Sequence, residues 1–211
     1  MQYLRRMQYY RLVEYTGRFK EPYWAEGIRY ADSQNVDFSK PETVCPLCGR
    51  AVSGFAWLEP HNIKLSGKRV GDFVFSTAGL LCNERCKDLI QQRGIKGVEE
   101  FMPVNTFYKK GCPTEQPYYL MKIAYSNKKY DYAVQQNERR KSDKSLPKCS
   151  LCMRSGNGLT NAFREIYFDD QDEYDIFRVY EKRTNIYCNE RFIQFCKDNK
   201  LTNIAEWFVK V

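Results

Sequence analysis

Two pairs of cysteines have a spacing that could bind a metal ion. The first pair lies in CPLCGR at 45–50 and the second in CSLCMR at 149–154, at an offset of 104 residues. Two thiolates at Cys-x-x-Cys spacing lie on a tight turn and can contact the same ion, and four thiolates complete the tetrahedral shell of a structural Zn²⁺. We therefore expect cysteine thiolates of this chain to hold structural zinc.

The spacing leaves open which four cysteines meet. One arrangement joins the two Cys-x-x-Cys turns, or knuckles, around a shared ion; its ligands are Cys45, Cys48, Cys149 and Cys152. A second arrangement closes a local site, because Cys-x3-Cys at a helix start places both sulfurs on one face; its ligands are Cys45, Cys48, Cys82 and Cys86. In a third, no metal binds and the cysteines are small buried apolar groups. Cys112, Cys188 and Cys196 are interpreted as structural in every case.

A second pattern recurs around the letters CNER, which occur at 82–85 and again at 188–191. An alternating apolar run typical of a strand precedes each copy, GDFVF at 71–75 and DIFRV at 175–179. Asn83 and Asn189 suit the N-cap of a following helix, which Gly94 or Asn199-Lys200 would end. CNER is therefore interpreted as a helix start rather than an active site.

The recurrence of these parts in one order predicts an internally duplicated, zinc-stapled α+β fold. Each module contains a Cys-x-x-Cys knuckle, antiparallel strands, a helix and a short strand. We expect an N-terminal β segment packed on the core at 1–42, repeat module 1 at 43–105, a basic connector with β strands at 106–146, and repeat module 2 at 147–211.

Composition and charge restrict the class of protein. The chain has 211 residues, 43% of them hydrophobic, which excludes a disordered or fibrous protein. Its net charge of +8 is concentrated at 109–148, where 10 basic residues face 4 acidic ones. The acidic run DDQDEYD at 169–175 lacks the glycine of an EF-hand loop and is interpreted as a solvated loop.

Neither an enzyme nor an exported protein is expected. Four thiolates leave no open position on a metal, and His61, the single histidine, has no nucleophile at a recognisable spacing. No apolar stretch has the length of a signal peptide core or a membrane span. Nine cysteines without such a signal indicate a reducing compartment, so we expect a cytoplasmic protein with no membrane partner.

The order of these motifs resembles that of the double-CXXCG motif immunity proteins of bacterial polymorphic toxin systems. The resemblance covers nearly the full length, from YYRLVEYTGRF at 9–19 through both knuckles to the strand, helix and strand at 175–211. It implies that the protein binds and neutralises a cognate toxin, with ligands Cys45 and Cys48 beside Gly49, and Cys149 and Cys152. Met153 stands where the second motif has glycine.

A zinc-knuckle regulator that binds nucleic acid is the alternative function. The basic connector and the knuckles motivate it, and it predicts binding that weakens steeply with salt. It is the weaker hypothesis, because the basic residues lie in the connector and not beside a recognition helix.

Overall fold

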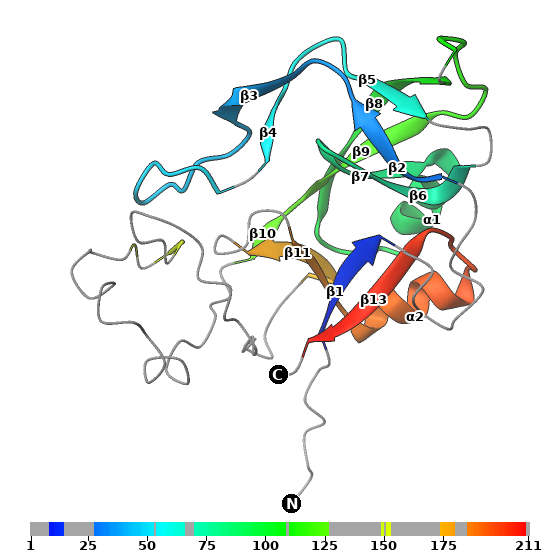
Figure 1. The fold of residues 1–211 in the computed structure, drawn as a ribbon. Coiled ribbons are helices and arrows are strands. Elements are labelled where there is room, and N and C mark those ends of the chain that lie inside the picture. The colour runs from blue at the N-terminus through cyan, green and yellow to red at the C-terminus, as the bar shows by residue number, and fades with distance from the viewer. Residues whose placement is uncertain are drawn as a thin grey trace, which may run out of the picture.

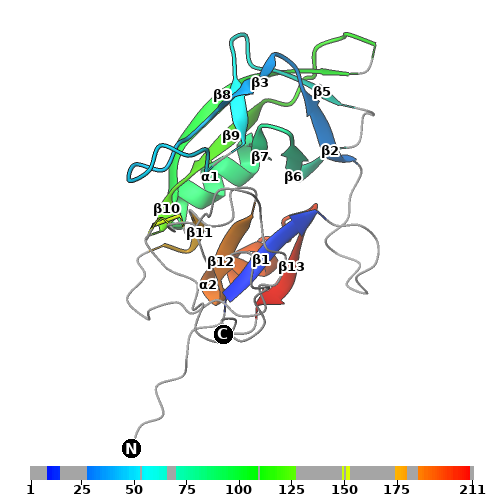
Figure 2. The same ribbon diagram turned by 60° about the vertical axis from the view of Figure 1, so that its left-hand side comes forward.

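A computed structural model describes residues 9–14, 28–52, 54–65, 70–108, 110–126, 149, 151–152, 174–179 and 185–209. The basic runs at 128–129 and 135–148, most of the acidic run at 169–175 and Met153 lie outside the described residues. Within the described part the protein is mostly β, with a barrel, a five-stranded sheet and two helices. The barrel lies above the five-stranded sheet in both ribbon views (Figures 1 and 2).

The barrel closes through six strands in the order β2-β5-β8-β9-β7-β6. Its strands are β2 (Ile28–Ser33), β5 (Asn62–Leu65), β6 (Val70–Ser76), β7 (Gly79–Asn83), β8 (Val98–Tyr108) and β9 (Tyr118–Ile123). The barrel is mixed rather than antiparallel as expected, since β2 is parallel to β6 and β5 is parallel to β8. The strand β2 lies between β5 and β6, which run in opposite directions. It is therefore antiparallel to β5 and parallel to β6.

The five-stranded sheet has the order β10-β11-β12-β1-β13. Its strands are β1 (Tyr9–Glu14), β10 (Tyr125–Ser126), β11 (Ile176–Val179), β12 (Ile186–Asn189) and β13 (Ile204–Val209). The expected strands at 71–75 and 175–179 are confirmed as β6 and β11. The strand β8 runs across the limit expected at residue 105, and the domain boundaries stay predictions.

Two apolar layers follow from the alternation of side chains along β6 and β7. Val74 and Leu81 point into the barrel and pack with Ile63 and Leu120. Their neighbours, which include Phe73, point the other way and join the larger core between the barrel, the helices and the sheet. Both faces of β6 and β7 are therefore buried.

Helices α1 (Glu84–Gln92) and α2 (Glu190–Asp198) begin where the CNER pattern predicts them. The Asn83 side chain accepts a hydrogen bond from the Cys86 amide at 2.8 Å, and Asn189 accepts one from the Phe192 amide at 3.0 Å. Both asparagines are extended N-caps, so each satisfies an amide that the helix itself leaves without a partner.

The arginine of the first CNER links the two strand–helix units. Buried Asp72 on β6 accepts hydrogen bonds from Asn83 at 3.0 Å and from Arg85 at 2.8 Å through its Oδ1. Its Oδ2 accepts from the amide and the hydroxyl of Thr202, which follows α2. Arg85 also donates to the carbonyl of Asn199 at the end of α2, at 2.7 Å. The first unit is thus bonded to the C-terminal end of the second helix.

The second CNER makes the reciprocal contacts. Buried Asp175 accepts from Asn189 and Arg191, each at 3.0 Å, and from the Lys96 amide at 2.9 Å. Arg191 donates to the carbonyl of Gly94, at the end of α1, at 3.4 Å. Each arginine therefore connects the aspartate of its own unit with the C-terminal end of the other unit's helix. We call these two networks the Asp72 clamp and the Asp175 clamp.

A two-stranded arm extends from the barrel (Figure 1). It consists of β3 (Val36–Pro41) and β4 (Phe55–Trp57), which pair antiparallel, and of the loop between them that holds the first knuckle. Near the loop, Lys122 of β9 forms an ion pair with Glu42 at 3.0 Å. The arm is thus joined to the barrel by this contact as well as by its own chain.

Candidate metal centre

The first knuckle is a tight turn at the end of the arm. The Gly49 amide donates to the Cys45 carbonyl at 2.8 Å, and the Cys45 amide donates to the Arg50 carbonyl at 2.7 Å. An isolated bridge between Val44 and Ala51 closes the turn. Gly49 has a φ of 69°, in the left-handed region that glycine adopts without a steric penalty. The Gly of CPLCG is therefore required by the backbone of this turn.

The second knuckle is described at Cys149, Leu151 and Cys152. The Cys152 amide donates to the Cys149 Sγ at 3.5 Å, a contact typical of a thiolate turned towards its own backbone. Partial burial raises the pKa of Cys149, but hydrogen bonds from the amides of Cys152 and Leu151 outweigh it and lower the pKa to about 6. This sulfur is poised to be a thiolate, the form that binds metal.

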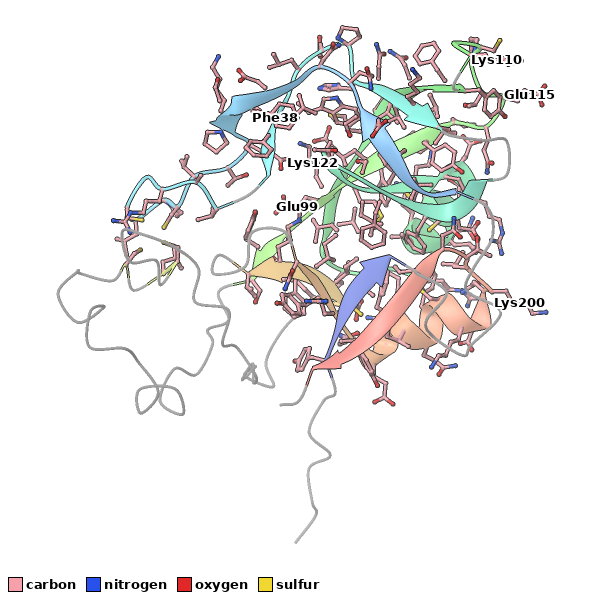
Figure 3. All side chains as sticks on the ribbon, viewed as in Figure 1. Phe38, Glu99, Lys110, Glu115, Lys122 and Lys200 are labelled. Carbon is pink, nitrogen blue, oxygen red and sulfur yellow. The ribbon has the colours of Figure 1, made fainter. Side chains whose placement is uncertain are left out.

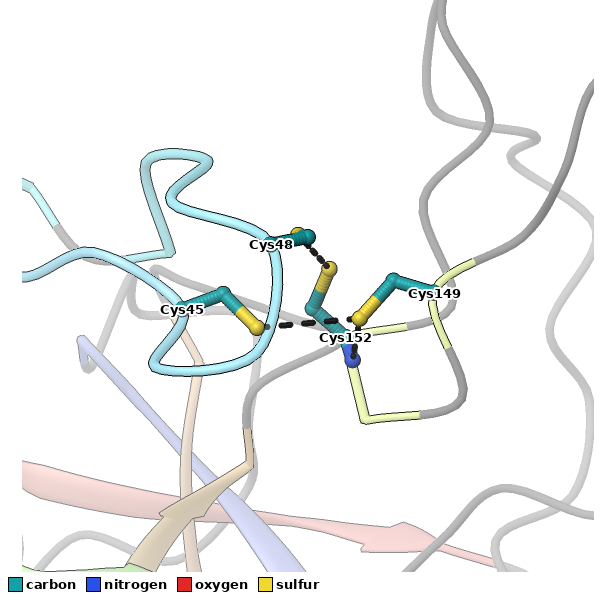
Figure 4. Close-up of side chains that lie close together, drawn as sticks. All are labelled: Cys45, Cys48, Cys149 and Cys152. Carbon is teal, nitrogen blue, oxygen red and sulfur yellow. Dashed lines mark hydrogen bonds between the residues drawn. The ribbon is translucent and has the colours of Figure 1, made fainter.

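The four sulfurs of the two knuckles meet in one cluster (Figure 4). The Sγ atoms of Cys45 and Cys149 are 3.7 Å apart, and those of Cys48 and Cys152 are 3.5 Å apart. All four lie within 4.8 Å of one another. Both close contacts join one knuckle to the other, so the cluster connects segments that are 104 residues apart in sequence.

The cluster fits a tetrahedral metal ion. Four sulfurs at about 2.3 Å from a Zn²⁺ lie about 3.8 Å from one another, close to the two observed contacts. None of the four cysteines is in a disulfide, since the separations of their sulfurs are far longer than the roughly 2.05 Å of an S–S bond. A set of four thiolates is also one of the ligand sets found in structural zinc sites. The four-cysteine cluster is therefore compatible with a structural metal such as zinc.

Burial divides the four sulfurs into two kinds. Cys45 and Cys152 are each 1% exposed and pack with Val52 in a small apolar cluster. Cys48 is exposed and Cys149 is half-buried. Each close sulfur pair therefore combines one buried thiol with one that solvent can reach.

The alternative local ligand set is not brought together. Cys82 on β7 and Cys86 in the first turn of α1 are fully buried in the large core, apart from the knuckle cluster. Within the described ranges, the one group of cysteine, histidine or acidic side chains placed to hold a metal is the knuckle cluster. Burial, and a hydrogen bond with Cys82, raise the pKa of the Cys86 thiol, which disfavours the thiolate that a metal needs. Cys82 and Cys86 do not join the knuckle cluster, because both side chains point into the core between the barrel and the helices.

The remaining predicted residues lie elsewhere. Cys188 and Cys196 are buried in the same core as Cys82, and Cys112 is exposed in the loop between β8 and β9. The His61 Nε2 lies 3.1 Å from the Trp57 carbonyl, and its ring contacts the Trp57 ring edge-on. His61 thus packs near the base of the arm.

No protein-family model matches the chain, and no curated protein is significantly similar to it. Among the helices of the described residues, none combines the length and the apolar character that a membrane-spanning helix needs. The arguments for a function therefore rest on the motifs and on the geometry of the chain itself.

Proposed function

We propose that this chain is a cytoplasmic immunity protein, which binds a cognate bacterial polymorphic toxin and neutralises it by covering its surface. The order of the motifs supports this function, through their resemblance to the double-CXXCG immunity proteins. In this proposal zinc at Cys45, Cys48, Cys149 and Cys152 is a structural staple. Four thiolates around the ion leave no position for substrate, so the protein acts by binding and not by catalysis.

Internal duplication is part of the same proposal. The two clamps support it, because each uses an aspartate, a capping asparagine and an arginine in the same roles, on two strand–helix units. The positive φ angles after the helices also correspond, 60° at Gly94 and 51° at Lys200. Two copies of one module, packed about an approximate twofold axis, account for these paired contacts.

The observation that carries the binding role is the apolar surface of the arm. Large apolar side chains exposed in the described part of the chain all lie on the arm, its knuckle loop or the residue after β4; they are Phe38, Val44, Leu47 and Leu58. Phe38 is 66% exposed and Leu47 is 61% exposed. Exposed large apolar side chains gathered on one part of a protein are a feature of surfaces that another molecule covers. Hence we assign the arm as the toxin-binding surface.

The metal would hold this surface in a fixed position. The tip of the arm is joined to the second knuckle through the cysteine cluster, and the Lys122–Glu42 ion pair joins the arm to β9 close to the knuckle loop. A surface fixed before binding loses less conformational entropy when the complex forms. Structural zinc therefore contributes to toxin affinity without touching the toxin.

The test uses the toxin encoded beside the gene of this protein, measured for binding and for growth rescue. Phe38→Ser is expected to weaken binding at least about tenfold, as loss of a central aromatic contact does. The matched control is Glu115→Gln, an exposed residue at the far end of the barrel from Phe38 (Figure 3), which should bind as the wild type does.

Three outcomes would count against the proposal. The first is that no toxin is encoded beside the gene, or that the encoded toxin does not bind. A second is that Glu115→Gln weakens binding as much as Phe38→Ser does. Binding to DNA or RNA that falls steeply with salt, without binding to the toxin, would favour the nucleic-acid regulator instead.

A further inference from the structure

We propose that the exposed Cys48 is a site of oxidation by peroxides, with Cys152 as the thiol that resolves it into a disulfide. The proposal rests on the zinc site of the preceding section. Peroxide would replace the zinc staple by covalent links between the two knuckles, while the arm stays joined to the second knuckle.

Accessibility and distance select these two residues. Cys48 is the exposed member of the cluster, and Cys152 is 1% exposed with its Sγ only 3.5 Å from that of Cys48. An exposed thiol beside a protected partner thiol is the arrangement of a reversible redox pair. The half-buried Cys149 and the buried Cys45 form a second pair of the same kind, at 3.7 Å.

The reaction balances with peroxide as the two-electron oxidant. The Cys48 sulfur attacks the peroxide O–O bond; an S–O bond forms, the O–O bond breaks, and a proton joins the leaving hydroxide as water. The Cys152 sulfur then attacks the sulfenic sulfur; an S–S bond forms, the S–O bond breaks, and a second proton gives a second water. Both sulfurs have then lost one electron each, and zinc has lost two of its ligands.

The other cysteines of the chain do not combine an exposed thiol with a buried partner thiol of the knuckle cluster. Cys82, Cys86, Cys188 and Cys196 are each 0% exposed in the large core, where peroxide has no access. Cys112 is exposed, but it is not a member of the cluster, and it supplies a matched control for simple accessibility.

The experiment treats the purified, zinc-loaded protein with hydrogen peroxide and follows three readouts. A colorimetric chelator measures zinc release, non-reducing electrophoresis measures compaction, and peptide mass mapping identifies the disulfides. We expect zinc release together with a Cys48–Cys152 disulfide, followed by Cys45–Cys149, and recovery of zinc binding after reduction. Closing a loop of 104 residues should also make the oxidised chain migrate faster.

A Cys112→Ser variant should release zinc at the wild-type rate, and Cys48→Ser should form no Cys152 disulfide. Disulfides within a knuckle, Cys45–Cys48 or Cys149–Cys152, would overturn the proposal even if zinc is released. Retention of zinc while Cys112 is oxidised would also overturn it. The zinc content before peroxide is added tests the metal site separately, and the disulfide map of the wild type stays decisive if Cys48→Ser folds poorly.

Discussion

Replacing Asp72 with asparagine removes one acceptor oxygen from the Asp72 clamp while it keeps the shape of the side chain. Asp72 is 6% exposed, and each of its two oxygens accepts two hydrogen bonds. An asparagine in this place has only one side-chain oxygen. Whichever way the side chain turns, its NH2 group faces two donors that have then lost their acceptor. The same change at Asp175 is milder, because its Oδ1 accepts from Asn189 alone.

The expected cost follows from the number of donors left without an acceptor. A buried donor that loses its partner costs about 1–3 kcal/mol. Asp72→Asn leaves two such donors, and Asp175→Asn leaves one if its oxygen keeps the bonds to Arg191 and Lys96. The Arg85 side chain is 52% exposed, so water compensates part of its loss. We expect a destabilisation of about 2–4 kcal/mol for Asp72→Asn and about 1–3 kcal/mol for Asp175→Asn.

The assay is equilibrium unfolding in urea, monitored by tryptophan fluorescence with zinc held constant. Asp37→Asn is the control, since Asp37 bonds only within the exposed arm, to Ser39 and Lys40, and should leave the midpoint unchanged. A larger destabilisation by Asp175→Asn than by Asp72→Asn would refute the donor argument. A midpoint of Asp72→Asn equal to that of the wild type would refute the clamp itself.

Three further predictions concern the metal, the N-cap of α2 and two glycines between α1 and β8. Cys149→Ser should lose zinc in native mass spectrometry while Cys86→Ala retains it, and zinc loss in both variants would contradict the shared site. Asn189→Ala removes an N-cap and a bond to the Asp175 clamp, so unfolding in urea should show a loss of about 1–3 kcal/mol. Gly97→Ala should cost about 3 kcal/mol or more, because φ is 105° and a Cβ would lie 1.8 Å from a backbone oxygen. Gly94→Ala, with φ at 60° and open space around it, should cost only about 1–2 kcal/mol by the same assay.

The parts of this fold that depend on local chemistry could be predicted from the sequence. The helices begin directly after their N-caps, Asn83 and Asn189, because the asparagine side chain accepts a hydrogen bond from an amide of the first helical turn. The knuckle at Cys45 follows from the left-handed position that Gly49 occupies. The shared cysteine cluster could be proposed only as one of three alternatives, since spacing within a segment does not determine which distant segment it meets.

The parts that depend on distant pairing could not be predicted. An alternating strand does not encode its neighbour, so the closure of the barrel through β2 was not apparent. Asp175 ends the acidic run and begins the strand run DIFRV, and its burial to 3% exposure does not follow from either pattern. One signal is present in the sequence, because Asp72 and Asp175 each directly precede apolar residues, FVF at 73–75 and IF at 176–177. Each of these runs leads to a CNER motif, which indicates that the two acids have the same role.

The position of β1 determines when the protein can complete its folding. This strand pairs with β12 on one side and β13 on the other, and Tyr9 lies opposite Val209, about 200 residues away in sequence. Its two neighbours lie about 180 to 200 residues further along the chain and are synthesised roughly ten to forty seconds after β1 at usual rates of translation. Until then β1 has both of its hydrogen-bonding edges unpaired, which is the state in which strands associate with other chains. A nascent chain of this protein therefore exposes β1 as an unpaired strand until β12 and β13 have been synthesised.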